Sequence, residues 1–201
     1  ACVSINGANR LGSNSLTELL VFGSRAGRNA AQFVHDNPDL DKSALEAQGR
    51  DEQKRISESF INKQDGKERI ASIRTELTST MESGAGIFRT ESSLVDTCNK
   101  VAELKERFKH AALDDHSLSF NTELTAALEL EFLLDVAEAL AHSALARKES
   151  RGSHQRTDFP ERDDEGFLKH SLAYHTGQEP RIDYQDVVIT QWPPAARVYG
   201  K

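Results

Sequence analysis

Between residues 66 and 147, three long stretches repeat apolar residues at helical spacing, and only short breaks separate them. The stretches cover residues 66–83, 91–110 and 122–147. In the third, the apolar positions spread over a wide arc, as a helix packed on two sides requires. Long helices joined by short connections favour antiparallel neighbours. The pattern therefore predicts a mainly α fold centred on an up-and-down three-helix bundle.

The apolar rows of the three helices are expected to form the core. They are Ile70, Ile73, Leu77 and Met81 in the first helix, Leu94, Cys98, Val101, Leu104 and Phe108 in the second, and Leu124, Leu128, Leu130, Leu133, Leu134, Ala137, Leu140, Ala141 and Ala144 in the third. The run Gly84-Ala85-Gly86 should end the first helix. Thr90 and Asn121 are suited to cap the second and third, because short polar side chains accept hydrogen bonds from free helical N–H groups.

The segment before the bundle reads as a short strand at residues 1–5, a loop and two helices. The first helix should start near Ser13 or Ser15 and carry one apolar face as far as Val34. Gly23 and Gly27 lie on that face, where their small size would permit close approach to other backbone. A linker at residues 36–41 leads to a polar helix at 43–62, whose sparse apolar face is Leu45, Ile56, Phe60 and Ile61.

After the bundle the pattern becomes irregular. Residues 149–164 mix charged side chains with little periodicity, and residues 167–174 and 181–190 read as two strands around a turn at 176–180. The sequence therefore divides into a loop and helix at 1–37, a helical domain at 43–149 and an irregular, β-hairpin extension at 150–201.

Composition excludes several classes of protein. The net charge is −7 and no basic run is present, so nucleic acid is not an expected partner. Cys2 and Cys98 lie too far apart in sequence to suggest a disulfide framework or a metal site, and a reducing compartment is expected. No apolar stretch approaches the length of a membrane span, and the N-terminus does not read as a signal peptide.

Residues 7–16 form a glycine-rich loop that leads into a helix. The start of a helix presents unpaired N–H groups and a partial positive charge, which suit an anion or the electron-rich edge of a ring. Arg10 adds a forked donor suited to a carboxylate. The pattern allows two interpretations: a site for an acidic ligand beside a cofactor, or a plain turn with a surface arginine.

A second charged stretch, residues 147–164, also allows two interpretations. It could form a catalytic cluster around His154, but buried charges usually pair, which favours an ion-pair network that fixes the bundle against a neighbouring domain. No metal site is predicted, because the acidic groups at residues 35–41 and 114–116 lack further ligands at suitable spacing. His142, His170 and His175 are interpreted as surface or packing residues.

Four stretches resemble the flavoprotein subunits of succinate dehydrogenase and fumarate reductase. They occur in the family's order and span nearly the whole chain. They are Gly-Ala-Asn-Arg-Leu-Gly-Ser-Asn-Ser-Leu at 7–16, Arg-Lys-Glu-Ser-Arg-Gly-Ser-His at 147–154 followed by Asp-Phe-Pro-Glu-Arg-Asp-Asp at 158–164, Phe-Leu-Lys-His-Ser-Leu at 167–172, and Pro-Pro-Ala with Arg-Val-Tyr at 193–199. The chain resembles the C-terminal portion of such a subunit.

The resemblance implies an enzyme that interconverts succinate and fumarate by hydride transfer with FAD. It implies that Arg10 binds a carboxylate of the dicarboxylate substrate, and that Asn14, Ser15 and Leu16 contact FAD. Asn6 stands where many relatives have histidine, which puts a proton or charge role at that position in doubt. The resemblance also places no catalytic residue in this chain, because the proton donor, the flavin-linking histidine and the dinucleotide motif belong to the N-terminal portion of such subunits.

The implied partners are that N-terminal flavin-binding portion, an iron–sulfur subunit and membrane anchor subunits. The implied location is cytoplasmic, peripheral on the inner face of the membrane. This chain alone is expected neither to hold FAD tightly nor to reduce fumarate. Two alternatives remain open: a fragment of an L-aspartate oxidase, which shares the loop signature in part, and a non-enzymatic helical interaction module.

Overall fold

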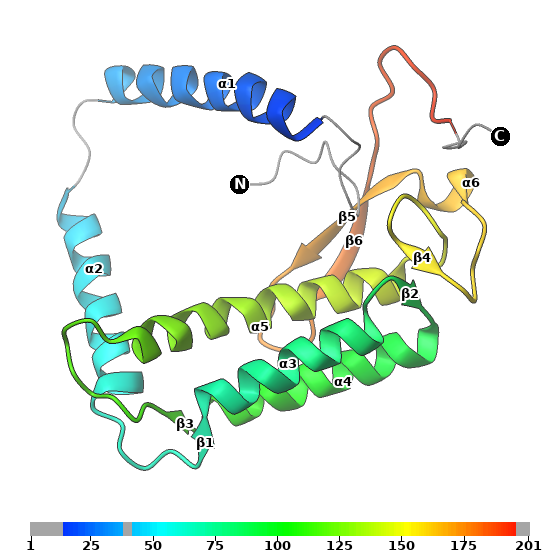
Figure 1. The fold of residues 1–201 in the computed structure, drawn as a ribbon. Coiled ribbons are helices and arrows are strands. Elements are labelled where there is room, and N and C mark those ends of the chain that lie inside the picture. The colour runs from blue at the N-terminus through cyan, green and yellow to red at the C-terminus, as the bar shows by residue number, and fades with distance from the viewer. Residues whose placement is uncertain (1–13, 38–41, 196–201) are drawn as a thin grey trace.

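The computed structural model describes residues 14–37 and 42–195. Three helices lie alongside one another at its centre: α3 (Ile70–Gly84), α4 (Glu91–Phe108) and α5 (Thr122–Ala146) (Figure 1). Each of the three packs against the other two. The predicted three-helix bundle is therefore confirmed.

The core of the bundle follows the predicted apolar rows. Its fully buried members come from all three helices and are Ile70, Ile73, Leu94, Val101, Leu104, Ala127, Leu130, Leu134 and Ala141. Burial of each large aliphatic side chain stabilises the fold by about 1.5–3 kcal/mol. The prediction was wrong for Leu133 and Leu140, which are 41% and 42% exposed. They lie on a side of α5 that the bundle does not cover in this chain.

Side chains cap two bundle helices as predicted. At the start of α4, Thr90 Oγ1 accepts a hydrogen bond from Ser93 N, and Ser93 Oγ accepts one from Thr90 N. At the start of α5, Asn121 Oδ1 accepts a hydrogen bond from Leu124 N at 2.7 Å. These contacts satisfy N–H groups that have no partner within the helix, so they fix where each helix begins.

The first bundle helix starts later than predicted, and the second ends earlier. Helix α3 begins at Ile70 rather than residue 66, because β1 (Glu68–Arg69) pairs in parallel with β3 (Ala111–Ala112). The same pairing ends α4 at Phe108. The polar helix is α2 (Lys42–Ile56), continued by a π-helical turn, η1 (Ser57–Ile61), whose Phe60 is buried in the core.

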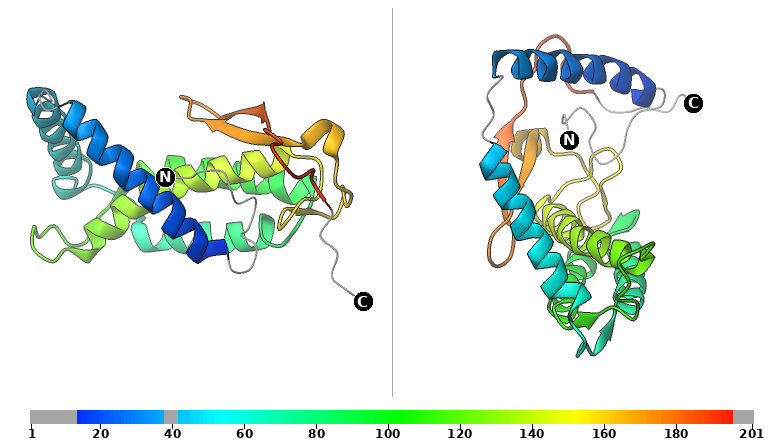
Figure 2. Two further views of the ribbon diagram at one scale, coloured as in Figure 1. Left: turned by 90° about the horizontal axis from the view of Figure 1, so that it is seen from above. Right: turned by 90° about the vertical axis from the view of Figure 1, so that its left-hand side faces the viewer.

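Helix α1 (Asn14–Asp36) lies apart from the bundle, and α2 connects the two (Figures 1 and 2). Its apolar side chains are exposed, with Leu16, Leu19 and Leu20 between 67% and 76%. Gly23 and Gly27 were predicted to allow a close backbone approach, but no described residue outside α1 comes within 4 Å of a Cβ built at either position. Within the described chain, this amphipathic helix has no apolar surface to pack against.

The C-terminal region is small and irregular, as predicted. Strand β4 (Gln155–Arg156) pairs in parallel with β2 (Phe88–Arg89), which lies between α3 and α4 in the chain. A short helix, α6 (Asp164–Phe167), precedes an antiparallel hairpin of β5 (Lys169–Tyr174) and β6 (Arg181–Asp186) that packs on α5.

Both predicted hairpin strands are shorter than expected. The first starts at Lys169 rather than residue 167, because α6 runs to Phe167. The second ends at Asp186 rather than residue 190, since Asp186 pairs with Lys169, the first residue of β5. None of the described helices is long and apolar enough to cross a membrane.

Candidate functional site

The first candidate site is the start of α1, where the sequence predicts contacts to a cofactor. Asn14 is the first residue of the helix, Ser15 is half-buried and Leu16 is 74% exposed. No acidic side chain lies in the described first turn of this 23-residue helix, whose N-terminus carries a partial positive charge. The first N–H groups of a helix have no partner within it, and beside an exposed apolar side chain they suit a flat, electron-rich ring, so these residues fit a flavin.

Part of the predicted site lies outside the residues that the structure describes. Arg10, the predicted substrate-binding residue, lies outside the described residues, as do the glycine-rich loop and Asn6. The assignment of Arg10 to a substrate carboxylate, and of Asn14, Ser15 and Leu16 to FAD, stays a prediction.

The second candidate site is the charged stretch after α5, and its centre is Glu149. This carboxylate is fully buried. It accepts a hydrogen bond from Arg147 Nη1, two from the Arg151 guanidinium at 2.8 and 2.9 Å, and one from Asp163 N at 2.8 Å. Burial alone would raise the pKa of Glu149, but the Arg151, Asp163 and Arg147 donors together hold this pKa below its usual value.

Arg147 links this centre to the hairpin. Its guanidinium donates to the carbonyl oxygens of Phe167 at 2.8 Å and Lys169 at 2.5 Å, as well as to Ser171 Oγ. It also lies 5.4 Å from the centroid of the Phe167 ring, which is within cation–π range. The end of α5 is therefore fixed to the start of β5.

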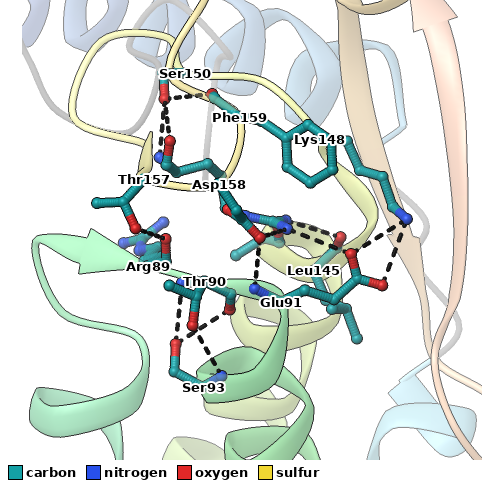
Figure 3. A network of polar contacts seen from close by, with 12 residues as sticks. Arg89, Thr90, Glu91, Ser93, Leu145, Lys148, Ser150, Thr157, Asp158 and Phe159 are labelled. Atoms are coloured by element: carbon teal, nitrogen blue, oxygen red, sulfur yellow. Dashed lines mark hydrogen bonds and ion pairs between the residues drawn. The ribbon is translucent and has the colours of Figure 1, made fainter.

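Arg156 and Asp158 connect the ends of two bundle helices. Figure 3 shows Asp158 beside Glu91. The buried Arg156 guanidinium donates to the carbonyl oxygens of Ala144 and Leu145 in the last turn of α5, at 3.3 and 3.2 Å. Asp158 accepts two hydrogen bonds from Arg156, each 2.8 Å, and one from Glu91 N at 2.7 Å. A cation thus lies at the C-terminus of α5 and an anion at the N-terminus of α4, which stabilises both helix dipoles.

The environment of His154 defines its protonation state. The side chain is buried, and Nδ1 lies 2.9 Å from Arg89 Nη1 while Nε2 lies 3.0 Å from the Arg147 carbonyl oxygen. Arginine can only donate, so Nδ1 accepts and the single ring proton is on Nε2. Burial, together with the positive charges of Arg89, Arg156 and Arg147, lowers the pKa of His154 and favours this neutral form.

The charged stretch therefore forms an ion-pair network within the described chain. That this network fixes the bundle against a neighbouring domain stays a prediction. The carboxylates of Glu149 and Asp158 accept hydrogen bonds from arginines and backbone N–H groups, and both ring nitrogens of His154 have partners. Sequence reasoning missed the contributions of Arg89, in β2, and of Glu91, the first residue of α4. Only the parallel pairing of β2 with β4 brings them to the network, and such a two-residue pairing leaves no periodic signal in the sequence.

We also considered a pocket and possible metal ligands among the described residues. An open pocket of about 320 Å³ lies between α3 and α4, and its lining includes Thr97 and Lys100. Thr97 Oγ1 already donates to a backbone carbonyl, and Lys100 pairs with Glu76 and Glu103. No group of three or more potential metal ligands occurs in the described parts of the chain.

The sequence is similar to a known family over most of its length. Residues 74–199 match the family described as fumarate reductase flavoprotein C-terminal. The fumarate reductase flavoprotein subunit of Mycobacterium tuberculosis is 53% identical over 100% of the chain. The succinate dehydrogenase flavoprotein subunit of Rickettsia bellii is 38% identical over 99%. The chain spans 35% and 34% of these two relatives, about a third of their length.

The fold is similar to solved structures of such proteins. A chain of Escherichia coli quinol fumarate reductase superposes with a TM-score of 0.88 at 48% identity. The superposition covers 96% of this chain and 33% of that one. Sequence and fold thus point to the same relatives, and both match this chain to the C-terminal third of them.

Proposed function

The chain belongs to the fumarate reductase flavoprotein C-terminal family, and from this premise we propose that the protein it forms part of interconverts fumarate and succinate with FAD. The observation that carries the proposal is the extent of the likeness, 53% identity over the whole chain to a fumarate reductase flavoprotein subunit. The higher identity to that subunit than to the succinate dehydrogenase subunit, at 38%, favours fumarate reduction as the working direction.

The exposed apolar surfaces support a chain that works within a larger subunit. On α1, Leu16 and Leu20 are 74% and 76% exposed, and on α5, Phe132 and Val136 are 63% and 62% exposed. Monomeric proteins rarely leave rows of large apolar side chains in water, because each exposed row loses the stabilisation of burial. The flavin-binding portion of the same subunit is the partner that we assign to these faces.

The roles of individual residues follow from their chemistry. The Arg10 guanidinium offers two parallel donors that would hold and orient one carboxylate of the substrate. The first turn of α1, with Asn14, Ser15 and Leu16, would bind FAD, where its N–H groups would stabilise negative charge on the ring. FAD supplies the hydride chemistry when it is bound. The proton donor for the reaction belongs to the rest of the subunit.

We propose the remaining context on the same basis. Electrons would be exchanged with an iron–sulfur subunit, and membrane anchor subunits would hold the assembly at the cytoplasmic face of the membrane. We also retain the division at 1–37, 43–149 and 150–201 as a proposal. In it, α1 completes the flavin-binding domain, while the bundle and the C-terminal extension form a scaffold beside it.

Substitution of Arg10 in the complete subunit tests the function. Arg10→Lys and Arg10→Ala should each lower kcat/KM for fumarate by about a hundredfold or more, because loss of an orienting, charge-assisted contact costs roughly 3 kcal/mol in the transition state. Flavin content should stay near that of the wild type. The measurements are flavin absorbance per subunit and steady-state kinetics with fumarate and succinate.

Arg28→Lys is a matched control, since Arg28 is an exposed arginine on α1. It should leave both flavin content and kinetics unchanged. Near-normal kinetics in both Arg10 variants would refute the substrate assignment. Loss of flavin as the main defect would instead assign Arg10 to the cofactor. A wild-type subunit that binds flavin but does not turn over fumarate or succinate would refute the proposed reaction.

A further inference from the structure

The segment that follows β6 has the composition of a strand but has no strand partner. Residues 187–190 are Val-Val-Ile-Thr, four residues that include three β-branched aliphatics and a β-branched threonine. Such residues favour strands because they pack well on a pleated surface. The hairpin cannot supply a partner, since Asp186 already pairs with Lys169 at the first position of β5.

The backbone of this segment is unpaired within the described chain. No backbone hydrogen bond joins residues 187–192 to another residue in the described ranges. The side chains are also in water, with Val188 82% exposed, Ile189 48% and Trp192 78%. If the segment joins a sheet, its backbone groups gain hydrogen-bond partners and its apolar side chains can be buried.

The charge pattern argues that this strand is covered in the working protein. Strands that stay at a solvent-exposed edge are protected by charged side chains, because an uncharged edge pairs with other chains and aggregates. Residues 187–196 contain no charged residue, whereas β6 carries Arg181, Asp183 and Asp186. Pro193-Pro194 then ends any pairing, since proline has no N–H to donate. The region able to pair is thus limited to residues 187–192.

The position of the segment identifies what covers it. Residues 187–195 extend beyond the hairpin to the side of the molecule on which α1 lies (Figures 1 and 2). The apolar face of α1 is itself exposed there, and the relatives are about three times as long as this chain. A single large body of the same subunit is therefore expected beside both elements.

We propose that residues 187–190 form an edge strand that pairs through its backbone with a β-sheet edge in the remaining portion of the flavoprotein subunit. This rests on the proposed function only in assigning the chain to a larger subunit. Successive N–H groups of a strand point to opposite sides, so a strand paired along one side uses only every second one. The partner edge needs apolar side chains to receive Val188 or Ile189 on its faces.

Amide hydrogen exchange in the complete wild-type subunit tests the proposal. Alternate amides of residues 187–190, two of the four, should exchange at least about tenfold more slowly than unstructured chain. Exchange at the rate of unstructured chain would overturn it. Protection that appears only with rising protein concentration, or only when an iron–sulfur subunit is added, would overturn the assigned partner.

Two adjacent proline variants distinguish strand pairing from simple burial. Val188→Pro and Ile189→Pro both suit an extended backbone, but only one of them removes an N–H that donates to the partner strand. One variant should therefore lower the melting temperature of the subunit by several degrees more than the other. Equal effects, whether both small or both large, would overturn one-sided pairing.

Val188→Thr is the control, because it keeps the N–H and the β-branched shape, and it should retain the amide protection. Fumarate turnover by the wild-type subunit tests the proposed function separately. Protection without turnover would leave the strand assignment standing, and turnover without protection would refute only the strand.

Discussion

Replacement of Glu149 by glutamine should destabilise the chain far more than its modest change in shape suggests. The carboxylate is fully buried and accepts four hydrogen bonds, from Arg147, twice from Arg151, and from Asp163 N. Glutamine has nearly the same volume but replaces one acceptor oxygen with an NH2 donor. Because each oxygen of Glu149 accepts two of these bonds, glutamine leaves two donors facing another donor.

The magnitude follows from this count. A hydrogen bond to a charged group contributes about 1.5–3 kcal/mol, and a neutral one about 0.5–1.5 kcal/mol. Loss of two charged bonds and weakening of the other two should cost about 3–5 kcal/mol, the range found when one partner of a buried ion pair is removed. Arg147 and Arg151 are 13% and 28% exposed, so water can partly solvate them. The lower end, about 3 kcal/mol, is therefore expected.

Thermal unfolding of the chain followed by helical circular dichroism measures this effect. A loss of about 3 kcal/mol should lower the melting temperature by about 6–12 °C for a domain of this size. Glu161→Gln is the control, since Glu161 is an exposed glutamate of the same segment, and its melting temperature should be unchanged. Equal melting temperatures for Glu149→Gln and wild type would refute the central role of Glu149 in the network.

Three further outcomes are expected. Leu134→Asp places an unpaired carboxylate at a position that is 1% exposed, so the bundle should lose its cooperative thermal transition, and an unchanged transition would contradict the core assignment. The lowered pKa of His154 favours its neutral form in the folded state, so its contribution to the free energy of unfolding is fully present above about pH 6.5 and is lost as the pH drops below that value. In His154→Gln, the free energy of unfolding, measured with denaturant at several pH values, should fall less over the same range. Burial raises the pKa of the Cys98 thiol to about 11, so peptide mass spectrometry should find it unmodified by iodoacetamide at about pH 8 until denaturant is added, and rapid labelling of the native chain would contradict its burial.

The sequence by itself determined the three-helix bundle and most of its core positions. Helical spacing of Ile73, Leu77, Val101 and Leu104 identified core positions that the structure buries, because burial of one face is what a 3.6-residue period encodes. Caps were equally readable, since Thr90 needs only neighbouring N–H groups to act as one. The motifs of the glycine-rich loop and of residues 147–172 also pointed to the family that the comparisons support.

Only the tertiary structure decided the features that depend on distant residues. The short parallel pairing of β1 with β3 moved the start of α3 to Ile70, and that of β2 with β4 brought Arg89 to His154. Neither pairing has a sequence period, because two residues are too few to show one. The apolar arc of α5 predicted packing on two sides, but Leu133 and Leu140 on that arc are exposed. Periodicity reports which face of a helix is apolar, whereas what covers that face depends on a surface elsewhere in the subunit.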